Sequence, residues 1–287
     1  MEQKKISAIA QWWEFTVEYV QILLGDKKNL LISMMFPVLA AVIVIWIAGE
    51  NMFLHYEGTK SGSFVLVSAA IWGGLFNSIQ IIVKERRIIK RNYVAGARLH
   101  CYTASRVIVQ FLLCTVQSII LTTSYIGVSK FHGNEMPAEG IVFSEPLVEF
   151  FISIVLLMYA ADMLGIMISC LVKKEEAANV LAPYILIVQL IFSGILFEME
   201  GAAKGISYAM ISKWGMESLG SIARLNDLNY RMVLENPNII LPHEAEAQFE
   251  AIPEHLFLVW IILLAFILGF VIIGNLLLHR VSKDTRE

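Results

Sequence analysis

A basic segment at residues 84–98, KERRIIKRNYVAGAR, combines charge with regularly placed apolar residues. It holds six Lys or Arg in fifteen residues, and basic residues beside a bilayer attract anionic headgroups. Apolar side chains recur among the cations, at Ile88, Ile89, Tyr93 and Val94. Glu85 adds an acid that can pair with a nearby arginine. This mixture favours a helix that presents one side to a protein over a loop that contacts lipid alone.

Asp162 is an acid inside a long apolar stretch. A carboxylate at membrane depth is costly and by default marks a functional site, such as a proton-coupling group. The alternative is a structural acid, hydrogen-bonded to Tyr159 one turn earlier or to a neighbouring span. The structural role is favoured because no partner acid or histidine accompanies Asp162 in the other spans.

Several kinds of catalysis lack their signature residues. The sequence contains no G-x-x-x-x-G-K-[ST] loop for nucleotide phosphates and no G-x-S-x-G nucleophile elbow. His243-Glu244 lacks the second histidine of a zinc-protease motif and indicates a solvated acidic loop. We therefore expect no catalytic residue, no metal site and no cofactor on this chain.

The composition requires a membrane environment for the elements that carry these residues. The chain has 287 residues, of which 57% are hydrophobic and 16% charged, and its mean hydropathy is +0.66. Soluble domains carry about 25% charged residues, so this chain lacks the polar surface of a soluble fold. We predict an all-α polytopic membrane protein.

Six apolar segments are predicted to span the membrane: 29–48, 63–83, 103–128, 147–171, 179–198 and 254–278. Five of them reach the roughly 20 apolar residues that a spanning helix needs. The segment 179–198 contains Pro183, which is tolerable because it lies near the predicted helix start.

The distribution of Lys and Arg predicts the orientation. With both termini in the cytoplasm, 16 of the 22 basic residues fall on the cytoplasmic side. Cytoplasmic loops carry the excess of Lys and Arg in membrane proteins. The reverse orientation would invert this ratio, so both termini are predicted to be cytoplasmic.

Two further segments are neither spans nor ordinary loops. Residues 6–24 place apolar side chains every three to four positions and so predict an amphipathic helix. This helix either anchors to the membrane surface or also packs against cytoplasmic machinery. Residues 199–253 form a long external stretch, with re-entrant or interfacial helices in its apolar first part and a polar lobe after them.

Polar and aromatic residues in two predicted spans are candidates for lining a translocation path. Asn77 follows small residues along one stripe of segment 63–83, and small residues let helices approach closely. Segment 179–198 adds Gln189, Phe192, Ser193 and Phe197. Lining a path and packing between helices remain equally open for Asn77, Gln189 and Phe192.

Two blocks of residues resemble the membrane subunits of type-2 ABC exporters, nearest the G (white-like) subfamily. The first block consists of Glu85-Arg86, Tyr93, Gly96, Tyr102 and Arg106. It is similar to the family pattern that ends the second span and forms the coupling helix. The second block is Ser193-Gly194 followed by KWGMESL at 213–219. It looks like the family's region of short helices that dip back from outside before the final span.

The resemblance implies a single type-2 permease domain over residues 1–287, with 6–24 as the connecting helix and 84–98 as the coupling helix. The implied ATPase-coupling residues are Glu85, Arg86, Arg87, Arg91, Tyr93 and Gly96. It also implies a partner ATPase in two copies that binds ATP and Mg²⁺, and a second permease copy, identical or related. Nucleic acid is not an expected partner, whereas membrane lipid is.

The implied activity is export of a hydrophobic or amphipathic substrate, such as a drug, lipid-like compound or peptide, by alternating access. The chain departs from eukaryotic members because it shows no fused ATPase domain and no cysteines in the external stretch. This pattern resembles a prokaryotic system in the cell membrane with a separate ATPase. Two alternatives remain: an ion-gradient transporter that uses Asp162, and a non-transporting immunity or scaffold protein.

Overall fold

The computed structural model describes residues 7–48, 52–131, 133, 136–197, 199–228 and 245–283. Across these ranges the regular secondary structure is helical, and no strand occurs among them. The helices are α1 (Ala8–Gly25), α2 (Lys27–Ala48), α3 (Tyr56–Ser78), α4 (Ile81–Val94), α5 (Leu99–Phe131), α6 (Pro146–Leu171), α7 (Glu175–Ile191), α8 (Gly201–Ser207), α9 (Ile211–Ile222), η2 (Ala247–Phe249) and α11 (Pro253–Lys283). The predicted all-α class is confirmed.

Five helical runs in the described part of the chain are long and apolar enough to cross a membrane. They are Lys27–Trp46, Tyr56–Val94, Leu99–Phe131, Pro146–Leu171 and Pro253–Arg280. The run Tyr56–Val94 joins α3 and α4, which are separated only by Ile79 and Gln80. Helix α7 has 17 residues and is not among the five, so the sixth span stays a prediction.

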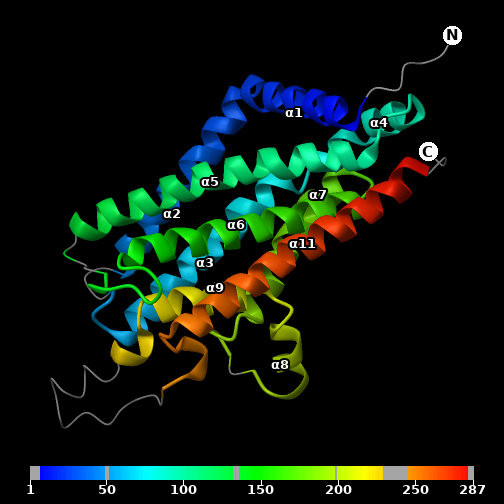
Figure 1. Cartoon of the computed structure of the whole chain (residues 1–287). Coiled ribbons are helices and arrows are strands. Elements are labelled where there is room, and N and C mark those ends of the chain that lie inside the picture. The colour runs from blue at the N-terminus through cyan, green and yellow to red at the C-terminus, as the bar shows by residue number, and fades with distance from the viewer. Residues whose placement is uncertain are drawn as a thin grey trace, which may run out of the picture.

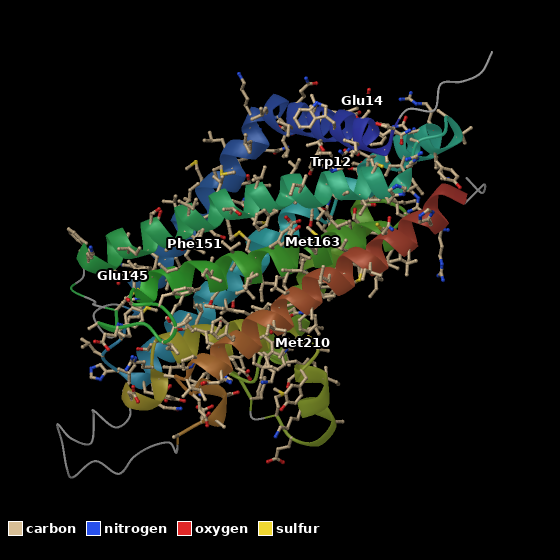
Figure 2. All side chains as sticks on the ribbon, viewed as in Figure 1. Trp12, Glu14, Glu145, Phe151, Met163 and Met210 are labelled. Atoms are coloured by element: carbon tan, nitrogen blue, oxygen red, sulfur yellow. The ribbon has the colours of Figure 1, made fainter. Side chains whose placement is uncertain are left out.

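Helix α6 is the centre of the bundle. It contacts α3, α5, α9 and α11 (Figure 1), and most of its residues are buried. An α-helix that is apolar all round is suited to such a position. Helix α9 is buried along its whole length, against α3, α6 and α11. Figure 2 shows Met163 of α6 inside the bundle.

Helix α1 lies alongside the first half of α5 (Figure 1), where Ala8 and Tyr19 contact residues of α5. The face that packs against α5 carries Phe15 and Tyr19, whereas Ile9 and Trp13 stay exposed. In Figure 2 Glu14 points away from the bundle and Trp12 points toward α5. The exposed apolar side of α1 suits the headgroup region of a bilayer.

Several helix bounds differ from the predicted ones, and the predicted coupling helix 84–98 corresponds to α4, Ile81–Val94. Helix α3 begins at Tyr56 rather than residue 63, and Thr59 in its first turn accepts a hydrogen bond from Phe53 N and donates one to His55 O. Helix α5 begins at Leu99 rather than 103. Helix α7 ends at Ile191 rather than 198, and Gly194, with φ +80°, turns the chain just beyond it.

The external stretch 199–253 starts with α8 and α9, which lie where the sequence predicts re-entrant helices. Most of the predicted polar lobe falls on residues 229–244, outside the described residues. Glu246, beyond them, accepts hydrogen bonds from Lys60 and from the Tyr56 hydroxyl. Burial raises the pKa of the Glu246 carboxyl, but these hydrogen bonds outweigh it and leave the pKa below its usual value.

Two adjacent glycines of α3 provide a matched test of its packing against α6. A Cβ at Gly74 would lie 2.1 Å from the carbonyl oxygen of Met158, whereas at Gly73 the nearest atom is a Phe36 ring carbon at 3.5 Å. Backbone cannot give way as a side chain can, so we expect Gly74→Ala to cost about 1–3 kcal/mol or more. We expect Gly73→Ala to be close to neutral. Thermal unfolding of both variants in detergent tests this, and equal shifts would contradict the close contact.

Candidate functional site

The acid of the basic segment, Glu85, lies in a three-helix junction. Its Oε2 accepts a hydrogen bond from Arg106 Nη2 at 2.6 Å and another from the Tyr102 hydroxyl. Glu85 belongs to α4, and both partners belong to α5. The ion pair is largely removed from water, since 2% of the Arg106 side chain and 16% of the Glu85 side chain are exposed. We call Glu85, Tyr102 and Arg106 the α4–α5 clamp.

Arg106 also connects the clamp to α1. Its Nη1 donates to the carbonyl oxygen of Phe15 at 3.1 Å. Its guanidinium carbon lies 4.2 Å from the ring centroid of Tyr19 and 4.3 Å from that of Tyr102. A buried guanidinium needs such compensation for lost hydration. One side chain therefore holds α1, α4 and α5 in register.

Tyr19 is held in its neutral form. Burial raises the pKa of the Tyr19 hydroxyl above its ordinary value. The hydroxyl oxygen accepts a hydrogen bond from Gln110 Nε2 at 2.9 Å. The ring that faces Arg106 is thus fixed at both its face and its hydroxyl.

The opposite side of α4 is open and basic. Its exposed residues share one face of the helix and are Lys84, Arg87, Ile88, Arg91 and Val94. Positions three and four apart in an α-helix are neighbours on its surface. The helix therefore presents cations mixed with apolar side chains outward, while the α4–α5 clamp holds its back.

Two further predicted coupling residues are Arg86, in the second turn of α4, and Gly96, just beyond its end. Arg86 Nη1 donates to the carbonyl oxygen of Val172, just beyond α6, at 2.7 Å. Gly96 has φ +94°, and its N–H bonds to the carbonyl of Tyr93 at 3.0 Å. Left-handed glycine is the usual end of an α-helix. Of the six predicted coupling residues, Arg87 and Arg91 face outward, while Glu85 and Arg86 face the bundle.

The predicted path residues have different hydrogen-bond partners in the described structure. Asn77 Nδ2 donates to Gln117 Oε1 at 2.6 Å, in a groove between α1, α2, α3 and α5. Gln189 instead anchors α9, because its Oε1 accepts from Ser212 N at 3.1 Å. Beyond α7, Phe192 is half-buried, Ser193 is buried and bonds to the Leu190 carbonyl, and Phe197 is exposed.

Asp162 is completely buried in α6. Its Oδ2 accepts from Cys114 Sγ at 3.0 Å, and its carbonyl oxygen accepts from Ser78 Oγ at 2.5 Å. The expected alternative of a bond to Tyr159 is wrong, because the Tyr159 hydroxyl donates to the Val107 carbonyl. The other alternative, a bond to a neighbouring helix, is what the structure shows.

Two residues of the α4–α5 clamp were missing from the predicted coupling set. Arg106 and Tyr102 belong to the first resemblance block but not to the predicted coupling set. The available signal was Arg106 itself, a cation inside an apolar segment, which is as costly as Asp162. Lys213 of the second resemblance block is buried in α9 and paired with Glu217 one turn later.

Comparison with known proteins agrees with this architecture. The family model of the ABC-2 type transporter matches residues 10–223. The ABC transporter ATP-binding/permease protein Rv1747 of Mycobacterium tuberculosis is 29% identical over 149 residues, which cover 51% of this chain. The match covers 17% of the length of that relative. The family match extends over more than half of the residues and includes every helix from α2 to α9, so the chain belongs to the ABC-2 type transporter family.

Proposed function

We propose that this membrane component of an ABC transporter is the permease of an ATP-driven exporter, in which α4 is the surface that receives the ATPase. The observation that carries the proposal is the two-sided character of α4. Its outward face is basic and apolar, and its inward face is clamped through Glu85 to Arg106. A helix that must transmit force needs both a contact surface and a rigid connection to the spans.

The ATPase is proposed to be a partner, bound in two copies to two permease copies. The 287 residues contain no P-loop, so ATP and Mg²⁺ are proposed to bind to the partner. The M. tuberculosis relative is named as both ATP-binding and permease protein, which supports a functional link between the two activities.

The proposed topology has cytoplasmic termini and six spans, which are the five long apolar runs and, before the last of them, α7. At about 1.5 Å per residue, the 17 residues of α7 extend about 25 Å, close to the thickness of a hydrocarbon core. The beginning of α1 and the end of α11 lie at the same end of the bundle as α4 (Figure 1). A chain whose two ends lie on the same side of the membrane must cross it an even number of times, as six spans do.

The proposed mechanism is alternating access between two packed states. ATP binding closes the two ATPase subunits, and the closure displaces α4 of each permease. The α4–α5 clamp passes the displacement to α5 and α1, while α3 passes it to α6 through the close contact at Gly74. Packed helices then move as rigid bodies rather than deform continuously. The apolar spans suit a hydrophobic or amphipathic cargo.

Co-purification with charge-reversed variants tests the docking surface. We expect the double variant Arg87→Glu/Arg91→Glu to co-purify with about one tenth or less of the ATPase that the wild type retains. Two exposed positive charges that would attract the ATPase become negative charges that repel it. Lys204→Glu is the matched control, since Lys204 is exposed on α8, far from α4 (Figure 1). Mass measurement of the complex gives the subunit ratio.

Two results would contradict the proposal. One is equal ATPase retention by the double variant and the wild type. The other is solubilised protein that transports substrate without ever associating with an ATPase.

A further inference from the structure

A groove of about 590 Å³ opens between the amphipathic helix α1 and the bundle. Residues of α1, α2, α3, α4 and α5 all contribute to its wall. Its volume is in the range of small-molecule sites. The groove shares Lys84 with the exposed face of α4 and Glu85 with the α4–α5 clamp, but Arg87 and Arg91 do not line it.

The groove changes from charged to apolar along its length. Asp26 and Lys84 line it at the start of α2 and in α4. One to two turns deeper, Gln117 donates to the carbonyl of Ser33 at 3.1 Å and exchanges hydrogen bonds with Asn77. Deeper still, Phe36 of α2 and Gly73 of α3 line the groove. Helices α2 and α3 run in opposite directions, yet both have their polar residues toward the same end.

The apolar part is also accessible from outside the bundle. Trp72 and Phe76 line it, and their rings stack at 5.7 Å with an interplanar angle of 16°. Both side chains remain more than 40% exposed. Exposed aromatic and aliphatic groups beside membrane spans face acyl chains. The gradient therefore has the polarity of a lipid, with the headgroup end at Asp26 and the chain end at Phe36.

Three charged residues line the headgroup end, namely Asp26, Lys84 and Glu85. Glu85 is paired with Arg106, whereas Asp26 and Lys84 have opposite signs and are not paired with any oppositely charged described residue. The Asp26 carboxylate accepts from the backbone N–H and the side chain of Asn29. It keeps acceptor capacity for an ammonium group. The Lys84 ammonium can bind a phosphate as a point charge. Together they complement a headgroup that carries one phosphate and one amine.

We propose that this groove binds a zwitterionic phospholipid with a primary-amine headgroup, of the phosphatidylethanolamine type. The ammonium bonds to Asp26, the phosphate to Lys84, and an acyl chain lies along Trp72 and Phe76. The amide pair of Asn77 and Gln117 contacts the glycerol ester region. This inference goes beyond the proposed function and does not depend on an ATPase.

Fluorescence quenching by brominated lipid tests the proposal on the isolated full-length protein. Phosphatidylethanolamine, phosphatidylcholine and phosphatidylglycerol with dibrominated acyl chains are titrated into detergent micelles that contain the protein. The quenching that is lost in Trp72→Phe reports the groove, because bromine quenches only at short range. We expect half-saturation with phosphatidylethanolamine at least about five-fold below phosphatidylglycerol.

Charge-selective variants complete the test. Asp26→Asn keeps an acceptor oxygen for Asn29 but removes the charge, and we expect it to abolish the preference for phosphatidylethanolamine. Lys84→Gln is expected to weaken phospholipid quenching without changing quenching by brominated diacylglycerol, which has no phosphate. Lys28→Ala, an exposed position outside the groove lining, is the control and should behave as wild type. Equal quenching by all lipids, stronger binding of phosphatidylglycerol, or an unchanged preference in Asp26→Asn would each overturn the proposal.

Discussion

Replacing Glu85 with glutamine is expected to lower ATP-driven transport about ten-fold or more, while ATP hydrolysis by the bound ATPase continues. Glutamine keeps an oxygen that accepts from Arg106 and Tyr102, so the junction of α4 with α5 persists in a weaker form. The Tyr102 hydrogen bond to a carboxylate, worth about 1.5–3 kcal/mol, becomes a bond between neutral groups, worth about 0.5–1.5 kcal/mol, and Arg106 loses the opposite charge. A loss of about 1.4 kcal/mol corresponds to a ten-fold change in an equilibrium.

The expected uncoupling follows from the position of the clamp. The ATPase would still bind the outward face of α4, which Glu85→Gln does not touch. Movement of α4 would then be absorbed at the loosened contact instead of reaching α5 and α1. Parallel measurements of ATP hydrolysis and substrate flux in proteoliposomes separate coupling from docking.

Alanine is the less informative substitution at this position. Glu85→Ala would leave Arg106, which is 1% exposed, with neither its counter-charge nor a hydrogen-bond acceptor at this position. Breaking a buried pair in this way costs about 3–5 kcal/mol, so loss of transport could reflect unfolding. Glu176→Gln, an exposed acid in the first turn of α7, is the control. Unchanged coupled transport in Glu85→Gln would refute the role of the clamp.

Hydropathy predicted the fold class because helices that lie in lipid need long runs of apolar residues, and such runs can be recognised in the sequence. It also located α2, α6 and α11 to within a few residues. It extended α7 too far, since Phe192 to Phe197 are apolar while the chain turns at Gly194. Hydropathy registers polarity and does not register a positive φ angle.

The site was predicted only in part for a related reason. The importance of Glu85 could be inferred from its acid character among cations and from the family pattern. Its partner Arg106 is 21 positions later on another helix, and only the tertiary structure shows that they meet. Likewise Asp162 was recognised as an unusual acid, but its contact with Cys114 depends on how α5 and α6 pack. The spacing of residues in a motif predicts which side chains share a face of one helix, but it does not predict contacts between two helices.

The buried pair in α9 makes the second large prediction. Lys213 and Glu217 form an ion pair one turn apart in a helix whose residues are all buried. The Lys213 ammonium also lies 4.7 Å from the ring centroid of Tyr208 and 4.8 Å from that of Trp214. We expect Lys213→Met or Glu217→Leu alone to destabilise the protein by about 3–5 kcal/mol, because each leaves one buried charge uncompensated.

The double variant Lys213→Met/Glu217→Leu is expected to recover most of that loss. Its side chains have similar length and no charge, and replacing a buried ion pair by apolar residues is often neutral. Thermal and denaturant unfolding in detergent, arranged as a double-mutant cycle, measures the coupling directly. Additive losses from the two single substitutions would show that the charges act independently and would refute the pairing. A recovered double variant that still failed to transport would show that the pair contributes to function as well as to the stability of α9.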